Sequence, residues 1–171
     1  MKNAIEINSG NNRQKGLPPL VGNAPEILIL GTLPGNESIR NREYYNNSRN
    51  RFWKIMARIT GEQLLTYVEK EEFLKSRHIA LWTVLESAIR TGSTNKRLKD
   101  EKPNDLCGFL KLHPTIHTLI FEGEKAGKYF SKYFGNSNIG CVQILKLPST
   151  SSTNTHETEV SLCEKWKDIF F

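Results

Sequence analysis

Residues 26–35 read Glu-Ile-Leu-Ile-Leu-Gly-Thr-Leu-Pro-Gly, a short apolar run that ends at a glycine. An apolar run of this length, closed by glycine and proline, is typical of a buried strand followed by a tight loop. Strands that are apolar at every position occur mostly in parallel sheets, where helices cover both faces. We therefore expect an α/β fold that contains this segment as a buried strand.

Helical and strand patterns alternate along the rest of the chain. Phe52, Ile55, Met56 and Ile59 have the spacing of one helical face, and Gly61 follows as a C-cap. The alternation predicts a three-layer α/β/α fold with a central four-stranded, mostly parallel sheet. The other predicted helices cover 66–77, 104–112, 123–134 and 157–169, and the other predicted strands cover 79–81, 116–121 and 141–145.

The domain organisation is simple. The 171 residues contain no internal repeat and no long linker. The polar, Asn-rich start predicts a flexible tail over 1–20, which leaves a single domain over 21–171. Residues 91–103 are polar and basic, so we expect a surface loop there.

Charge and composition favour some function classes and exclude others. Lys and Arg number 24 against 18 Asp and Glu, a net charge of +6, which suits a polyanionic partner. Many basic proteins bind no nucleic acid, so charge alone leaves the partner open. No apolar run approaches the 18 residues of a membrane span, and the start lacks the apolar region of a signal peptide. We expect a soluble cytoplasmic protein.

The three cysteines, Cys107, Cys141 and Cys163, lie far apart and form no CxxC pair. Three thiolates cannot supply a Cys₄ zinc site or an iron–sulfur cluster. We expect free, mostly buried thiols, with no metal site.

Polar segments follow the predicted strands. Ligands of parallel sheets bind at the carboxyl ends of the strands. The segments at those ends are 31–50, Glu122 and 147–154. We expect a single cleft to collect all three.

Two motifs carry a resemblance to a known family. Residues 31–35 read GTLPG, Tyr44-Tyr45 follow, and residues 48–54 read SRNRFWK. Near the end of the sequence stands Leu147-Pro148-Ser149-Thr150-Ser151. Together, these segments resemble the uracil-DNA glycosylase superfamily, most closely its hypoxanthine-DNA (deoxyinosine) glycosylase branch. The mismatch-specific uracil glycosylases are also similar, and the resemblance covers about residues 27–166. It implies a uracil-DNA glycosylase-like fold and a monomer that acts on DNA without a cofactor.

The resemblance implies a site for a base that is flipped out of the duplex. Tyr45 occupies the position of an aromatic that stacks on the base, and the alternative is that it packs into the core. Backbone N–H groups of the glycine loop would stabilise the base as it leaves with negative charge, although the loop could be a plain turn. The base-binding residues expected are Gly31, Thr32, Leu33, Pro34, Gly35, Tyr45 and Glu122.

Asn50 matches the Asn of the second motif, which implies that it places the attacking water. It could also cap the helix that begins at Arg51, and one Asn could do both. The loop after the last strand, with Arg49 beside it, is expected to contact the DNA backbone, the alternative being an ordinary surface turn. The backbone-contacting residues expected are Arg49, Ser149, Thr150 and Ser151. Further cations, Arg51 among them, could add a basic rim.

Several positions depart from the family pattern. Glu122 stands where relatives carry an Asn that reads the base edge, and an ionised carboxylate can only accept hydrogen bonds. Leu33 and Leu147 replace an Asn and a His that relatives use, and Thr83 replaces an Asp. The leading hypothesis is a monofunctional glycosylase that excises hypoxanthine or uracil. One alternative is a glycosylase with a shifted base preference, and another is a catalytically inactive DNA-binding protein. A nucleotide-binding enzyme is a third and much weaker alternative, because the sequence contains no P-loop.

Overall fold

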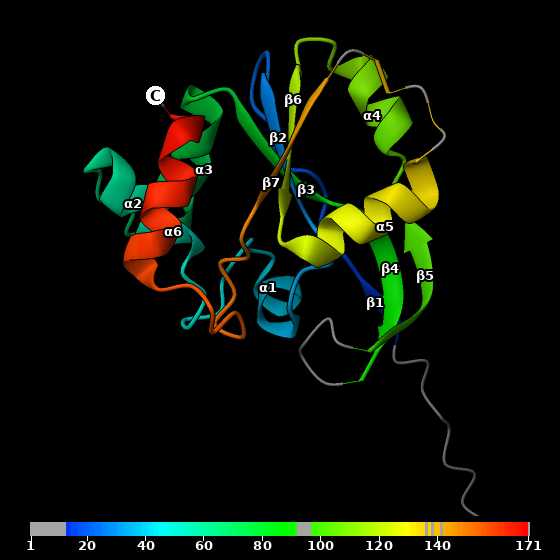
Figure 1. Cartoon of the computed structure of the whole chain (residues 1–171), viewed down its shortest axis with the longest axis horizontal. Helices are drawn as coiled ribbons and strands as arrows, with labels where there is room; N and C mark the ends of the chain where they lie inside the picture. The colour runs from blue at the N-terminus through cyan, green and yellow to red at the C-terminus, as the bar shows by residue number, and fades with distance from the viewer. Residues whose placement is uncertain (1–12, 92–96, 136, 138, 141, 171) are drawn as a thin grey trace, which may run out of the picture.

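A computed structural model describes residues 13–91, 97–135, 137, 139–140 and 142–170 (Figure 1). Its centre is a four-stranded parallel sheet with the strand order β3-β2-β6-β7, which confirms the predicted sheet. The strands are β2 (Ile27–Gly31), β3 (Ile79–Thr83), β6 (Thr118–Glu122) and β7 (Gln143–Leu147).

Strand β2 lies between two partners. Ile27 pairs with Ile79 of β3 and with Thr118 of β6, both in parallel register. Leu28 and Ile29 are fully buried. The run at 27–30 is apolar at every position because this strand faces helices on both sides.

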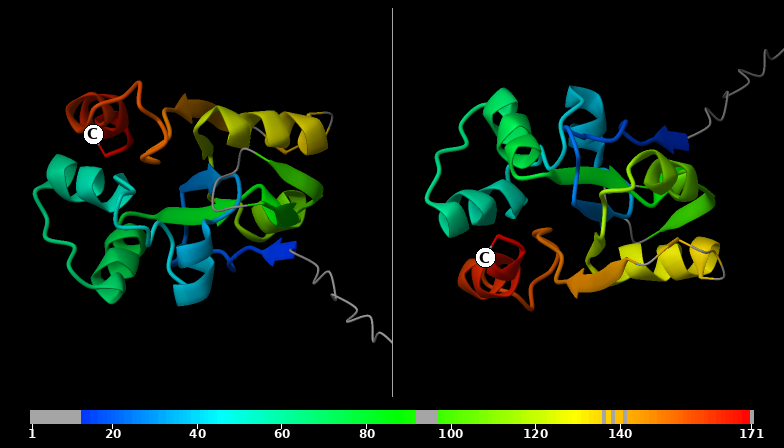
Figure 2. Two further views of the ribbon diagram at one scale, coloured as in Figure 1. Left: turned by 90° about the horizontal axis from the view of Figure 1, so that it is seen from below. Right: turned by 90° about the horizontal axis from the view of Figure 1, so that it is seen from above.

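Helices cover both faces of the sheet (Figure 2). Successive side chains of a strand point to opposite faces, so Ile29 lies in one core cluster and Leu28 with Leu30 in the other. The first cluster includes residues of α2 (Phe52–Thr60), α3 (Tyr67–Ser76) and α6 (Glu159–Trp166), and the second includes residues of α4 (Leu106–Leu112) and α5 (Glu124–Phe134). The three-layer α/β/α architecture is confirmed.

The helix boundaries follow local capping signals. Gly61 ends α2 with a φ of 74°, the left-handed conformation that favours glycine. Thr66 and Glu69 form a capping box at the start of α3, and Asp105 caps α4 by accepting from Gly108 N–H. A short helix, α1 (Asn36–Asn41), lies inside the loop after β2, and a 3₁₀ turn, η1 (Lys167–Ile169), follows α6.

A second, antiparallel sheet corrects the prediction of a surface loop over residues 91–103. It has the order β1-β4-β5, formed by β1 (Arg13–Lys15), β4 (Leu85–Arg90) and β5 (Leu98–Pro103). Residues 98–103 are therefore a strand and not a loop; they form an edge strand, which carries charged side chains because it faces solvent. Residues 92–96 of that predicted loop lie outside the described part of the chain.

The predicted tail also differs from the structure. Residues 13–20 belong to the fold, because β1 pairs with β4 and the side chains of Leu17 and Leu20 are buried. Leu20 also forms a bridge with Leu81 of β3. The remaining tail residues, 1–12, lie outside the described residues. Strand β7 begins two residues later than predicted, and Cys141 is outside the described residues as well.

The state of the cysteines and the length of the helices can also be compared with the sequence analysis. Cys107 and Cys163 are free thiols, each partly buried. Within the described ranges, no helix is long and apolar enough to cross a membrane.

Candidate active site

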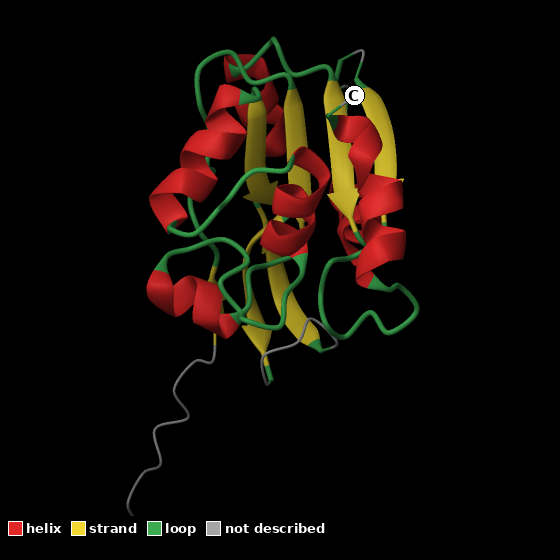
Figure 3. Cartoon of the chain, turned by 90° about the vertical axis from the view of Figure 1, so that its left-hand side faces the viewer, coloured by secondary structure: helices red, strands yellow, loops and turns green. Residues whose placement is uncertain are grey.

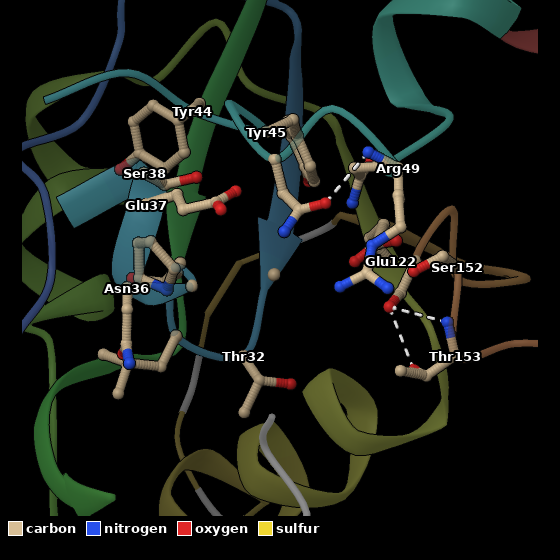
Figure 4. Close-up of a pocket in the computed structure, with 18 of the residues that line it drawn as sticks. Thr32, Asn36, Glu37, Ser38, Tyr44, Tyr45, Arg49, Glu122, Ser152 and Thr153 are labelled. Carbon is tan, nitrogen blue, oxygen red and sulfur yellow. Dashed lines mark hydrogen bonds between the residues drawn. The ribbon is translucent and has the colours of Figure 1, made fainter. Parts of the chain in front are cut away.

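A cavity of about 280 Å³ opens at the carboxyl end of the central sheet. The strand arrows in Figure 3 point toward the loops that surround it. Figure 4 shows Thr32, Tyr45, Arg49 and Glu122 around this cavity. A cavity near 300 Å³ is at the small end of the size range of ligand sites, so it suits a small ligand.

The structure brings together most of the residues expected from the sequence. The lining includes the whole glycine loop 31–35, Tyr45, Asn50, Arg49, Glu122 and Ser151. Ser149 lines a neighbouring cavity, which Glu122 also borders, and Thr150 is fully buried behind the wall. Seven further lining residues were not named individually but lie in the segments expected to form the cleft: Asn36, Glu37, Ser38, Tyr44, Asn47, Ser152 and Thr153. Trp82 and Thr83, at the end of β3, lie outside those segments and were missed as lining residues.

Tyr45 forms a flat wall of the cavity. Its ring stacks on Phe52, with centroids 3.9 Å apart and planes 12° from parallel. Phe52 is fully buried, so Tyr45 packs on the core with one face and still borders the cavity. Its backbone has a φ of 56°, which costs energy for a non-glycine residue. Burial, with the Glu122 carboxyl and Tyr44 nearby, raises the pKa of the Tyr45 hydroxyl, so it stays protonated.

Asn50 is held by its side-chain oxygen. Asn50 Oδ1 accepts from the backbone N–H of Phe52 at 2.8 Å and from the hydroxyl of Thr150 at 3.1 Å. The first bond satisfies a free N–H at the start of α2. The helix begins at Phe52, one residue later than expected, and its N-cap residue is Arg51 and not Asn50. The amide Nδ2 donates to none of the described residues, so it can act on a ligand in the cavity that Asn50 lines.

Glu122 ends β6 and is anchored through one oxygen. Its Oε1 accepts from Ser149 Oγ at 3.0 Å, from Thr150 N at 2.6 Å and from Thr150 Oγ1 at 3.0 Å. Burial raises the pKa of this carboxyl above its usual range, although those hydrogen bonds act in the opposite direction. Glu122 therefore belongs to the cavity wall and does not point into solvent.

Arg51 organises the Ser/Thr-rich loop after β7. Its guanidinium donates to the carbonyl oxygens of Ser151 at 2.8 Å and of Asn154 at 2.9 Å, and also to those of Thr150 and Glu157. An arginine engaged in this way is not a free cation for the DNA backbone, so its place in the expected basic rim is corrected. Arg49, in contrast, is exposed at the cavity.

Arg90 of β4 holds the glycine loop in the same manner. It is only 3% exposed, and it donates to Pro34 O at 2.7 Å, to Leu33 O at 3.3 Å and to Asn36 Oδ1 at 3.2 Å. Burial lowers the pKa of its guanidinium to about 10, so it stays charged at neutral pH. Sequence reasoning missed Arg90, because the strand that carries it was not predicted.

The departures from the family pattern have local explanations. Leu33 is buried and packs with Leu85 and Ala88 of the second sheet. Thr83 donates to Leu85 O at 3.0 Å, and Asn104 donates to Thr83 O at 2.8 Å, so this corner has a network of its own. Among the described residues, no group of three or more His, Cys, Asp or Glu side chains could hold a metal ion.

Comparisons with known proteins give one consistent family. Residues 18–170 match the model of the "Uracil DNA glycosylase superfamily". A protein named hypoxanthine DNA glycosylase from Methanosarcina acetivorans is 35% identical over 92% of this chain and 98% of its own length. One of the same name from Methanosarcina barkeri is 37% identical over 68% of this chain and 75% of its own length.

A solved structure agrees. The solution NMR structure of a candidate uracil DNA glycosylase from Methanosarcina acetivorans superposes with a TM-score of 0.75 and 32% identity. The match covers 93% of this chain and 99% of that one.

Proposed function

Because the chain belongs to the uracil DNA glycosylase superfamily, we propose that it hydrolyses the N-glycosidic bond of a deaminated base, hypoxanthine or uracil, in DNA. The observation that carries this proposal is one small cavity in which Tyr45, Asn50 and the glycine loop meet. The names of the two Methanosarcina relatives favour hypoxanthine.

The chemistry follows from the geometry. The flipped base stacks against Tyr45, and the backbone of 31–35 stabilises the negative charge that develops on it. The C1′–N bond breaks and its electron pair leaves with the base. A water held by the Asn50 amide forms the new bond to C1′, and its proton passes to the departing base or to solvent.

The same surface suits DNA. Arg49 is an exposed cation at the cavity, and we propose that the Ser151 hydroxyl contacts phosphate beside it. Ser149 and Thr150, expected to contact the DNA backbone, instead donate within the protein to Glu122 and Asn50. The described residues that line the cavity include no lysine, so we propose a monofunctional enzyme that forms no Schiff base with the sugar. Its product is an abasic site, which a strand-cleaving reaction of base excision repair must consume. We propose that it acts as a cytoplasmic monomer and uses no cofactor.

A catalytically inactive DNA-binding protein is the second candidate. It is favoured by Leu33, which is buried at the position where some relatives orient water and cannot do so here. In that case the protein would bind lesion-containing DNA and release no base.

The test is excision from matched oligonucleotides that carry hypoxanthine, uracil, xanthine or a G·T mismatch, with alkali cleavage of abasic sites. We expect product from hypoxanthine or uracil only after alkali. Asn50→Ala should lose activity by about 10²–10³-fold, in the range of a lost transition-state hydrogen bond. Asn50→Asp keeps the cap oxygen but lacks the amide donor, so it should stay folded and be inactive. Wild type that binds DNA and releases no base would favour the second candidate.

A further inference from the structure

The hydrogen bonds of Glu122 are distributed unevenly over its two oxygens. Ser149 Oγ and Thr150 N donate to Oε1, and the hydroxyl of Thr150, whose single proton also faces Asn50 Oδ1, lies at the same oxygen. In the described part of the chain, no group donates to Oε2. Oε1 is thus saturated as an acceptor, and Oε2 is the oxygen that remains for a ligand.

Glu122 lies where its free oxygen, Oε2, can contact the base. Glu122 ends β6 and lines the same cavity as Tyr45 and Asn50. Thr150, which holds Oε1, is completely buried and is itself tied to Arg51 through its carbonyl oxygen. The carboxyl group is therefore fixed in orientation, as a group that reads a base edge must be.

We propose that Glu122 is a specificity-determining residue that keeps its proton on Oε2 and donates it, as a hydrogen bond, to the carbonyl oxygen of the excised base. This rests on the proposed function. Burial, which raises the pKa of the carboxyl, supports the protonated form. The proton stays on Glu122, so no proton transfer is required.

A neutral acid at this position distinguishes deaminated bases from their parents. Deamination replaces the exocyclic amino group of adenine or cytosine, a donor, with a carbonyl oxygen, an acceptor. A carboxylic acid O–H pairs with the carbonyl and would be left unpaired against an amino group, which costs binding. The neutral acid thus supplies the donor that an amide supplies at this position in relatives, whereas an ionised carboxylate would favour the amino-bearing parents.

Other titratable and charged groups surround Glu122. They come from the loops after β2, from α5, from β7 and from the loop after it. Those that line either cavity with it are Glu37, Tyr44, Tyr45, Arg49, Glu124, Lys125, Lys146 and Glu157. A variant that removes the titration of Glu122 alone is needed to assign a pH effect to it.

The experiment is single-turnover excision of hypoxanthine against pH for wild type, Glu122→Gln and Glu124→Gln. The wild-type rate should be constant at low pH and fall tenfold per pH unit above the pKa of Glu122. Glu122→Gln keeps the Oε1 acceptor and places an amide donor at the second position, so its rate should stay level and exceed wild type at least tenfold at high pH. Glu124→Gln, in the neighbouring cavity, should keep the wild-type profile.

Other results would overturn either this proposal or the proposed function, and the two cases can be distinguished. A wild-type rate that is level or rises with pH, or a Glu122→Gln variant that keeps the wild-type decline, would overturn the proposal while excision itself stands. No product from wild type at any pH would instead refute the proposed function. If Glu122→Gln does not fold, infrared titration of the protonated carboxyl in wild type gives the same answer, because a carboxyl already ionised at the lowest active pH contradicts the proposal.

Discussion

Thr150 Oγ1 lies 3.1 Å from Asn50 Oδ1, and this hydrogen bond joins two loops that are 100 positions apart in the sequence. The same hydroxyl is 3.0 Å from Glu122 Oε1, but it has one proton for the two acceptors. A neutral Glu122 competes for that proton less strongly than a carboxylate would. Thr150 thus connects the residue expected to read the base with the residue expected to hold the water.

Replacement of Thr150 by valine tests this connection. Thr150→Val keeps the shape of the side chain but removes the donor to Asn50, so we expect a rate about tenfold lower, equivalent to about 1.4 kcal/mol. Thr150→Ser keeps the hydroxyl and should stay within a few-fold of wild type. Single-turnover excision and thermal unfolding should be measured on both variants; equal rates for the two would show that the hydroxyl has no part in catalysis.

Tyr45 provides a test of base stacking. Its ring is supported from behind by Phe52, so Tyr45→Phe should keep both the stack and the activity. Tyr45→Ala should lose about 1–3 kcal/mol of transition-state stabilisation, the value of one stacked base. The measurement is kcat/KM for both variants at a temperature where each is folded. If Tyr45→Ala is as active as Tyr45→Phe, Tyr45 is a core residue only.

Arg49 and Arg51 are close in sequence but should differ in effect. Arg49 is exposed, and we expect Arg49→Ala to reduce the slope of log K against log salt for DNA binding by about 1. Arg51→Met removes the side-chain donor of four backbone carbonyls, so it should lower stability and activity and leave the salt slope unchanged. Fluorescence anisotropy at several salt concentrations separates the two roles. A change of slope in Arg51→Met would mean that Arg51 contacts phosphate.

Arg90 should act on catalysis from outside the cavity. Arg90→Met leaves Pro34 O and Leu33 O without this donor, which should cost about 1–3 kcal/mol of unfolding free energy. Because the loop backbone then loses its fixed position, kcat should fall more than KM changes. Arg90→Lys keeps the charge but lacks the planar fork, so only partial recovery is expected. Urea unfolding and steady-state kinetics provide the check; full kcat in Arg90→Met would exclude a positioning role.

Much of the central fold could be predicted because buried strands and helix faces require apolar residues at regular positions in the sequence. The run at 27–30 is apolar because β2 is covered on both faces, and the spacing of Phe52, Ile55 and Met56 marks the buried face of α2. The edge strand β5 of the second sheet has no such apolar pattern. Leu98–Pro103 is a charged edge strand whose sequence, LKDEKP, has the composition of a loop.

The sequence by itself determined the α/β class, the order of the central elements and the motifs whose residues meet in the cavity. Only the tertiary structure decided how those residues are held. Arg90 donates to a carbonyl 56 positions away and Arg51 to one 106 positions away. Every residue carries a backbone carbonyl, so an acceptor of this kind leaves no signal in the sequence, and the partners are known only once the chain is folded.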